Sequence, residues 1–385
     1  MTYSKALLCF SLSFIFGIFI SSFLNVPELI IYEFLILGVL FCLIFLKEKT
    51  IVVLGICLFI FGLGIFRAEI AKSLMTETSQ THGDVSPLKQ NLRNFISQNF
   101  SPPHSLILAA LTLGDDRQIS YEWKQKLNVT GLRHITAISG SHIILLAGIL
   151  TWFFIVLGFY RGQTFYPVLI FLVFFVFFTG LQPSAIRAGI MGSIFLFAQK
   201  LGRQKASLRT LVLAAALMLV FDPLLLWRNI GFQLSFLAVL GMIYLLPFFE
   251  NLFERIFFLR PFGFSYLLAV TFSAQIFTLP ITIYNFGYVS LAAPITNILI
   301  GPIIPFLLTI AFLFLFFGSI CQPLGWLISL PVYLMLDYWV LIADFFSRLS
   351  ISYINLEISW ICLPISYMLL GLFIYFLSKR KRLLI

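Results

Sequence analysis

The sequence is poor in charged residues. Only 10% of its 385 residues are Asp, Glu, Lys or Arg, whereas 61% are hydrophobic, and the mean hydropathy is +1.04. An average soluble domain is about a quarter charged, so this composition excludes a soluble globule. The net charge of +10 mainly reflects basic loops on one side of a membrane, and it does not indicate a nucleic-acid-binding domain.

Motifs for metals and nucleotides are also missing. The five cysteines lie in apolar stretches or in one short turn, which indicates neither a disulfide framework nor a metal cluster. The four histidines form no His-x-His-x-Asp-His series, and no Walker motif is present. The start of the chain resembles a signal peptide, but no Ala-x-Ala cleavage site follows, so we interpret it as an uncleaved first helix. We therefore expect no cofactor and no metal.

Long apolar stretches fill most of the chain. A helix needs about 20 apolar residues to cross a bilayer, and we identify twelve candidate stretches, or eleven if the short one at 208–221 is left out. They cover residues 6–24, 29–46, 51–66, 135–157, 165–180, 183–199, 208–221, 230–249, 264–284, 295–317, 324–346 and 360–377. The expected fold is an all-α polytopic membrane protein with about 11–12 transmembrane helices.

Basic residues alternate between the loops, as the positive-inside rule requires. The short loops on the opposite side carry only Arg228 and Arg348, besides Arg187 inside a span. This pattern predicts that both termini are cytoplasmic. The basic loops contain Lys47, Lys49, Arg161, Lys200, Arg203, Lys205, Arg209, Arg255, Arg260 and the cluster at 379–382.

One polar segment, residues 67–133, interrupts the apolar stretches and is predicted to be extracytoplasmic. Within it, residues 88–96, 105–113 and 121–127 are expected to form short amphipathic helices on the membrane face, and residues 75–86 a flexible connector. We therefore divide the chain into an N-terminal three-helix segment (1–70), a connector (71–133) and a transmembrane channel domain (134–385).

A polar block runs straight into an apolar stretch. The sequence Gly131-Leu-Arg-His-Ile-Thr-Ala-Ile-Ser-Gly-Ser-His142 precedes residues 143–157. Polar groups at membrane depth need a partner or a water-filled space, so several polar side chains are expected to converge on one interior path. The candidates for this path are His134, Ser139, Ser141, His142, Arg187, Gln233 and Asn297.

Each candidate also has a purely structural interpretation. Arg187 can contact a phosphate group through its planar fork, or it can pair with Asp222 or with backbone carbonyls. The two histidines, Gln233 and Asn297 can form hydrogen bonds between helices that hold the fold. The Phe-rich run 171–178 is expected to face lipid rather than to stack on bases.

An ordered series of motifs resembles the ComEC-type competence proteins, a family of membrane channels through which single-stranded DNA enters bacteria. The resemblance covers about residues 106–308. Its motifs are Leu113-Gly-Asp115 with Ile119-Ser120, Thr130-Gly131, His134, Ala137-Ile-Ser-Gly-Ser-His142, Pro183-Ser-Ala-Ile-Arg-Ala188, Gly202-Arg203, Asp222-Pro223, Gly231-Phe-Gln-Leu-Ser-Phe236, Leu279-Pro280, Phe286-Gly287 and Pro294 with Asn297.

The sequence departs from the family in three ways. Ser141 stands where the family usually has a bulky apolar residue. Residues 67–101 leave no room for the family's OB-like domain, and the metallo-β-lactamase-like domain that many members carry is not expected here. The resemblance therefore implies a short form, located in the bacterial cytoplasmic membrane. Its implied partners are single-stranded DNA and the lipid bilayer, with a DNA receptor, a helicase-type ATPase, a separate nuclease and a second copy of the chain as further candidates.

Two other functions fit parts of the sequence. A small-solute transporter with broken helices at the membrane midplane would also place polar residues inside spans. An intramembrane serine hydrolase would use Ser139 with His142, but a serine and a histidine three residues apart on one helix rarely face each other. We therefore expect that the chain is not an enzyme.

Overall fold

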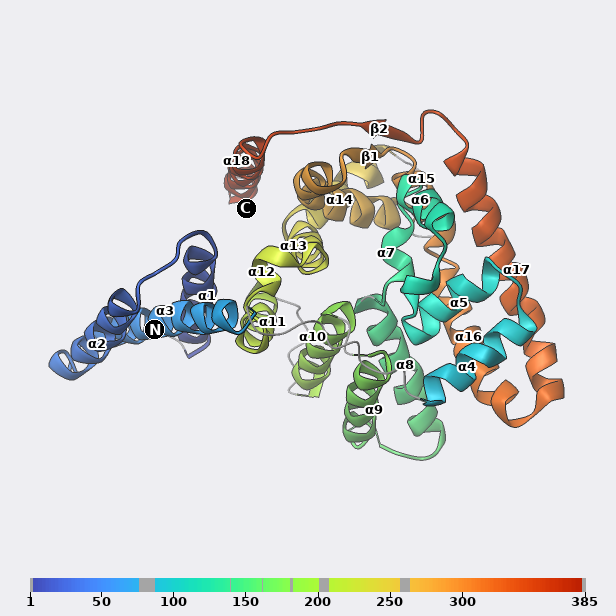
Figure 1. The fold of residues 1–385 in the computed structure, drawn as a ribbon, viewed down its shortest axis with the longest axis horizontal. Helices are drawn as coiled ribbons and strands as arrows, with labels where there is room; N and C mark the ends of the chain where they lie inside the picture. The colour runs from blue at the N-terminus through green and yellow to red at the C-terminus, as the bar shows by residue number, and fades with distance from the viewer. Residues whose placement is uncertain are drawn as a thin grey trace. The chain divides into compact units, whose positions relative to one another are not determined.

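The computed structural model describes residues 3–75, 87–138, 140–160, 162–180, 183–200, 208–256 and 264–382. These residues are almost entirely helical (Figure 1), which confirms the all-α class. The elements are α1 (Tyr3–Phe23), α2 (Glu28–Ile44), α3 (Lys49–Met75), α4 (Pro87–Asn99), α5 (His104–Leu113), η1 (Asp116–Gln118), α6 (Tyr121–Val129), α7 (Arg133–Thr136), α8 (Gly140–Val156), α9 (Phe165–Phe178), α10 (Pro183–Lys200), α11 (Leu208–Phe221), α12 (Leu225–Arg228), α13 (Ile230–Ile256), α14 (Phe264–Phe286), β1 (Tyr288–Ser290), α15 (Ala293–Ile300), α16 (Ile304–Ile320), α17 (Gln322–Ser347), β2 (Tyr353–Asn355) and α18 (Cys362–Arg382).

Every predicted apolar stretch contains helix, but the helices differ in length. Within the described ranges, five are long and apolar enough to cross a membrane, namely α1, α3, α13, α14 and α17. A sixth candidate is the pair α15 and α16, which is bent by 50°. Shorter apolar helices occupy much of the remaining stretches. The polytopic class is therefore confirmed, whereas the number of 11–12 transmembrane helices stays a prediction.

Two predicted stretches are broken rather than continuous. In the first, α7 ends at Thr136 and Ala137 is extended, with φ −82° and ψ 140°, before α8 begins at Gly140. In the second, α15 ends before Gly301 and Pro302. Gly301 itself stays helical, with φ −50° and ψ −47°, but Pro302 has no backbone N–H with which to continue the hydrogen bonds of α15 and its ring crowds the preceding turn, which accounts for the bend.

The chain divides into two compact units that are not contiguous in sequence. The first unit comprises residues 1–83 and 202–236, and the second comprises residues 84–201 and 237–385. Helices α11 and α12 therefore belong with the N-terminal helices. This grouping differs from the linear division expected from the sequence, because α1 packs against α11, far away in the chain.

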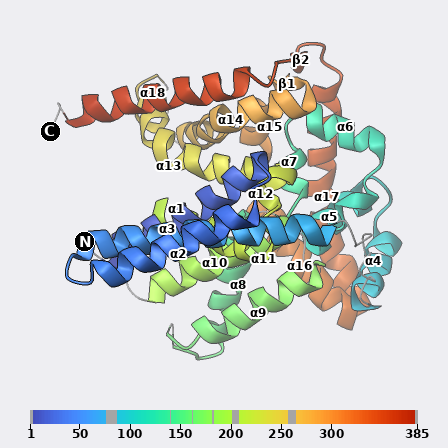
Figure 2. The same ribbon diagram turned by 60° about the vertical axis from the view of Figure 1, so that its left-hand side comes forward.

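In the first unit, α1, α2 and α3 lie side by side (Figure 2). Glycines allow these helices to approach closely. Gly17 of α1 lies against the backbone of α3, and Gly64 of α3 lies against the backbone of α1, so a Cβ atom at either position would collide with the facing carbonyl oxygen. Gly38 of α2 and Gly55 of α3 also lie against each other, so a Cβ atom at either position would crowd the carbonyl oxygen of the other. Close packing of this kind is what small residues provide between helices in membranes.

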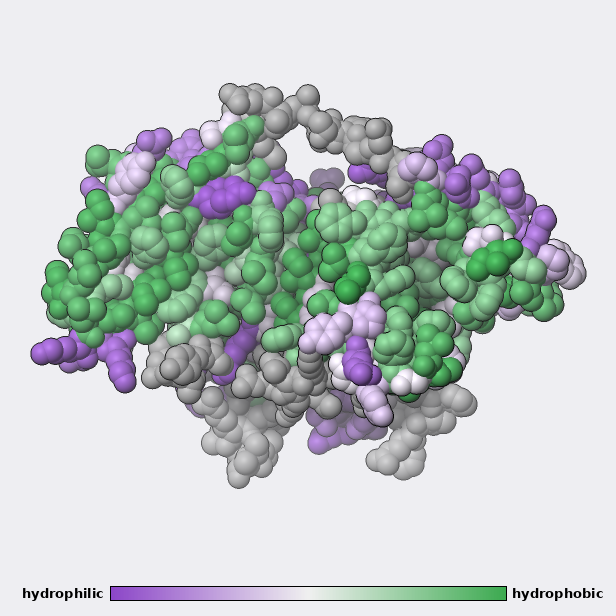
Figure 3. Space-filling view, turned by 90° about the horizontal axis from the view of Figure 1, so that it is seen from below, coloured by the Kyte–Doolittle hydropathy of each residue, from purple (hydrophilic) through white to green (hydrophobic). Residues whose placement is uncertain are grey.

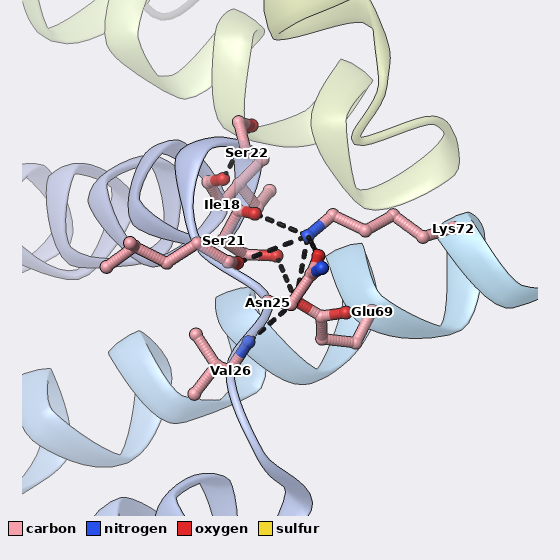
Figure 4. Close-up of polar contacts among 8 residues, drawn as sticks. Ile18, Ser21, Ser22, Asn25, Val26, Glu69 and Lys72 are labelled. Atoms are coloured by element: carbon pink, nitrogen blue, oxygen red, sulfur yellow. Dashed lines mark hydrogen bonds and ion pairs between the residues drawn. The ribbon is translucent and has the colours of Figure 1, made fainter.

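A cluster of polar groups closes one end of this three-helix assembly (Figure 4). Lys72 Nζ donates to the carbonyl oxygen of Ser21 at 2.5 Å and to Glu69 Oε1 at 2.9 Å. Glu69 Oε1 also accepts a hydrogen bond from Ser21 Oγ at 2.9 Å. In the same unit, Arg67 donates to the carbonyl oxygens of Val220 and Phe221 at the end of α11. Charged groups of α3 thus satisfy the free carbonyls at the C-termini of α1 and α11.

The second unit contains two buried cores. One lies among α8, α9 and α10, which form a three-helix group (Figure 1), and includes Ile143, Leu172 and Ala188. The other lies among α4, α5, α16 and α17 and includes Leu108, Phe314 and Trp339. Helix α8 also contacts α16, so the two cores adjoin.

The short helix α5 is buried rather than interfacial. Nine of its ten residues are buried, whereas a helix on the membrane face would expose one side. The prediction that residues 105–113 lie on the membrane surface is therefore wrong. The physical reason is that this helix is apolar on all sides, and a helix of that kind is stable only inside a core.

Segments predicted for one side of the membrane lie together in the second unit. Strands β1 and β2 pair antiparallel, with Val289 opposite Ile354. The end of α17 contacts α6 through the ion pair between Lys126 and Asp344, at 2.9 Å. The loops before α15 and after α17 and residues 126–131 of the polar connector, all predicted to be extracytoplasmic, lie together here. Residues 95–99 of the connector instead lie at the α16–α17 turn, which is predicted to be cytoplasmic, so the orientation stays a prediction.

Large apolar side chains cover much of the described surface. Figure 3 shows hydrophobic residues over most of the described part of the face that it draws. Exposed examples on the second unit include Trp326 (74%), Phe306 (65%) and Ile170 (70%). Soluble monomers rarely expose contiguous apolar patches of this extent, so these side chains form a surface for lipid.

Candidate functional site

The candidate site is the joint between the two broken stretches of the second unit. The turn after α6, at Thr130 and Gly131, lies against the start of α15. Ser290 Oγ donates to the carbonyl oxygen of Val129 at 2.6 Å, and Thr296 Oγ1 donates to that of Thr130 at 2.6 Å. These hydrogen bonds connect the segment that leads into α7 and α8 with the segment that leads into α15 and α16.

Gly131 is required at this joint for two reasons. Its φ is +72°, a left-handed conformation that glycine adopts most readily. A Cβ atom built on Gly131 would also collide with the Cβ of Ala293 and would lie 3.0 Å from its Cα. The backbone of one broken stretch therefore touches the first turn of the other.

His134 lies on the short helix α7, next to this joint. Its side chain is exposed, and its Nδ1 lies 2.9 Å from the carbonyl oxygen of Gly131. The neighbouring Arg133 pairs with Asp116 at 3.2 Å and donates to Thr136 Oγ1 at 3.1 Å. His134 is thus held by the local turn while its side chain remains exposed.

Beyond the break, the polar residues enter the α8–α10 core. His142 is only 2% exposed, in the first turn of α8. Of the two serines predicted beside it, Ser139 lies outside the described residues, and the side chain of Ser141 lies outside them as well. The structure therefore places one imidazole of the polar block at the surface and the other inside the bundle.

Arg187 is buried on α10, with 8% of its surface exposed. The same helix packs closely through small residues, because Gly189 lies against Val176 of α9 and Gly192 lies against Ile143 of α8. Asp222, the acidic partner considered for Arg187, belongs to the first unit, and its Oδ1 accepts the N–H of Leu224 at 3.0 Å. That carboxylate therefore has a local backbone partner.

Asn297 and Gln233 lie in different units. Asn297 is on α15, and its Oδ1 is buried with no hydrogen-bond donor among the described residues. A buried amide oxygen without a donor is costly unless water or a ligand supplies one. Gln233 belongs to the first unit and donates to the carbonyl oxygens of Leu226 and Trp227 at the end of α12. These two hydrogen bonds of Gln233 agree with the interpretation that its side chain stabilises the fold.

Sequence reasoning missed several residues of this region. Ser290 and Thr296 form the hydrogen bonds of the joint. The only feature of the sequence that could have indicated this role is that both residues lie near Pro294, which belongs to a family motif. Asp337 was also missed, although it lies within the apolar stretch 324–346. Its Oδ1 lies 3.3 Å from Nε2 of the buried His104. An acidic residue inside an apolar span is itself a signal of a polar contact.

A sequence model of the Competence protein family matches residues 111–381, which is more than half of the chain and includes the joint, α7–α10 and α14–α18. The chain belongs to the competence protein family. It is 29% identical over 222 residues to ComE operon protein 3 of Bacillus subtilis (strain 168), an alignment that covers 58% of this chain and 27% of that protein. No solved structure matches the chain.

Family membership and the long apolar helices together define a multi-pass membrane protein of the competence family. The family match begins at Leu111, within the buried helix α5, and extends almost to the end of α18. The chain spans 27% of the length of its curated relative, so the activity of the whole relative bears on this chain only as a proposal.

Proposed function

We propose that the chain forms part of the channel through which single-stranded DNA crosses the bacterial cytoplasmic membrane during natural transformation. The observation that carries this proposal is the hydrogen-bonded contact at Thr130–Gly131 and Ser290–Thr296 between the segments that lead into two broken helical stretches, within a competence-family chain. Broken helices expose backbone polar groups at membrane depth, and such backbone is tolerated only where it is buried in protein or lines a water-filled cavity.

The DNA path follows the polar residues around this joint. Buried Arg187 supplies a cation that can meet a phosphate through its planar fork. The ring of His134 and the unsatisfied oxygen of Asn297 supply polar groups beside the breaks. Ser139, Ser141 and His142 belong to the same path because they follow the first break directly, and Gln233 remains a separate candidate.

The proposed channel works without chemistry of its own. Energy and strand processing come from separate partners, namely a DNA receptor, a helicase-type ATPase and a nuclease, and the channel is proposed to associate with a second copy of itself. Among the described residues, no group of three His, Cys, Asp or Glu side chains is placed to hold a metal ion. The proposed location is the cytoplasmic membrane, with both termini in the cytoplasm.

Deleting the gene should abolish uptake of DNA while binding of DNA to the cell surface remains. The measurement is the entry of labelled DNA into a form resistant to external nuclease. A Ser139→Ala copy should at most weaken uptake, through packing or a lost hydrogen bond, because the channel needs no nucleophile at this position. Failure of Ser139→Ala at normal protein level, together with labelling of Ser139 by a fluorophosphonate probe in the unmodified protein, would establish an intramembrane hydrolase instead.

A second function is favoured by the bent pair α15–α16 and by the break before α8. Transporters of small solutes place their binding sites at such discontinuous helices. The same deletion strain separates the two functions, since loss of a transporter would leave DNA entry unchanged. The channel remains the proposed function because the family match covers both breaks.

The proposed orientation predicts opposite labelling of two exposed loops. In a cysteine-free background, a cysteine in place of Glu357 should react with an impermeant thiol reagent applied to whole cells, because this loop is predicted to be outside. A cysteine in place of Glu48 should react only after the cells are permeabilised. Both positions are exposed in the structure, so burial would not explain a difference, and equal labelling would contradict the orientation.

A further inference from the structure

The helical hairpin α4–α5 runs alongside the α16–α17 hairpin in the second unit (Figure 1). At one end, Lys126, which follows α5, contacts Asp344 near the end of α17. Further along, His104 contacts Asp337 and stacks on Tyr333 with ring centroids 5.0 Å apart. The hairpin therefore contacts α17 at several levels.

The C-terminal half of α4 reaches the opposite end of α17. Phe95 stacks on Phe314 with ring centroids 5.0 Å apart, and its ring lies against Gly318 and near Gly325, where α16 and α17 touch. Next to it is a cavity of about 350 Å³ at the α16–α17 turn, and its polar lining residues are Gln98, Asn99, Ser319 and Gln322. Residues 322 and 344 lie roughly 30 Å apart along a helix, which is about the thickness of the hydrocarbon core.

One face of α4 is polar and uncharged. Five exposed residues repeat at helical spacing and carry only amide or hydroxyl groups: Gln90, Asn91, Asn94, Ser97 and Gln98. The other face contacts the core through Phe95 and the buried Ile96. The two cations of the helix point away from the polar face, since Lys89 is buried and Arg93 lies 3.5 Å from Asp115.

This arrangement is incompatible with lipid around α4. An amide moved into hydrocarbon without a hydrogen-bond partner costs about 4–8 kcal/mol on a water-to-cyclohexane scale, and α4 presents four amides on one side. In the structure these five side chains are exposed, so the described residues of the second unit do not cover this face. The side chains therefore require a hydrated environment next to a helix that spans the bilayer.

We propose that the α4–α5 hairpin enters the membrane alongside α16 and α17, and that the polar face of α4 lines a water-filled passage. The occupant is water, because the face is neutral and offers both donors and acceptors without a charge to bind an ion. The proposal does not depend on transport of DNA, since it concerns only the depth and the hydration of α4.

The test combines a cross-link for depth with thiol labelling for hydration, on the full chain in native membranes and in a cysteine-free background. A disulfide between cysteines at Gln98 and Ser319 should form within one chain, because both residues line the same cavity. Single cysteines at Asn94 and Gln98 should react with a small impermeant thiol reagent. The matched control is a single cysteine in place of Ile96, which is 1% exposed, and it should not be labelled.

Three outcomes would overturn the proposal. Absence of the disulfide between positions 98 and 319 would show that the hairpin does not reach the α16–α17 turn. If the disulfide forms but the single cysteines at positions 94 and 98 do not react with the thiol reagent, lipid or protein covers the polar face. A cross-link at position 94 between two copies would identify that cover as a second chain. Substitutions at 94 and 98 replace exposed side chains, so the fold should persist, and the amount of protein in the membrane monitors it.

Discussion

Replacing Gly131 by alanine is expected to destabilise the second unit strongly. The added Cβ would collide with Ala293, and overpacking of this kind costs about 1–3 kcal/mol. The left-handed conformation at φ +72° adds about 1–2 kcal/mol for a residue with a Cβ atom. The sum is a large part of the stability of a typical domain, about 5–15 kcal/mol. The measurement is the amount of protein in the membrane and its thermal unfolding after purification in detergent.

Two further variants give this prediction its controls. Gly148→Ala places the same methyl group at a position with nothing within 4 Å, so it should leave unfolding unchanged. Ala293→Gly in the Gly131→Ala background removes the collision but not the backbone strain, and it should restore part of the lost stability. Normal unfolding of Gly131→Ala alone would show that the joint tolerates movement and does not hold the two breaks together.

Arg187→Gln is expected to reduce DNA uptake by about tenfold or more, because hydrogen bonds to charged groups contribute about 1.5–3 kcal/mol. Arg187→Lys keeps the charge but loses the planar fork, so its uptake should fall less. Both effects follow from the proposal that buried Arg187 meets the phosphates of the passing strand. The measurement is nuclease-resistant entry of labelled DNA at equal protein level.

The controls separate transport from folding. Arg209→Gln removes an exposed cation at the start of α11 and should leave uptake unchanged. A structural role for Arg187 would instead lower the amount of both Arg187 variants in the membrane. If Asp222 were its partner, Asp222→Asn would have the same effect. Full uptake by an abundant Arg187→Gln protein would remove this residue from the proposed path.

Hydropathy alone located the long helices, because a bilayer span needs a long run of consecutive apolar residues. Such a run can be recognised in the sequence without knowledge of the tertiary structure. The stretch 324–346 and helix α17 (Gln322–Ser347) differ by only one or two residues at their ends. The motifs from Leu113 to Asn297 indicated the family, which the match over residues 111–381 confirms. These features depend on composition and local order, and neither changes with the way in which the helices pack.

The breaks were only partly visible in the sequence. Gly131 and Gly140 of the polar block flank the first break, and the structure shows α7 and α8 on either side of Ala137. The break between α15 and α16 was not predicted, although Gly301 and Pro302 mark it. Apolar runs conceal such breaks because Gly and Pro are more frequent in membrane helices than in soluble ones.

The sequence by itself determined that this protein is a helical membrane protein of the competence family with a polar block beside an apolar span. Only the tertiary structure decided which polar residues meet: Thr130 with Thr296, His104 with Asp337, and Lys126 with Asp344. It also decided that α5 is a core helix and that α11 packs with α1. The physical reason is that hydropathy states how much a residue avoids water, whereas contacts between distant segments depend on helix faces, small residues and hydrogen-bond partners that become neighbours only on folding.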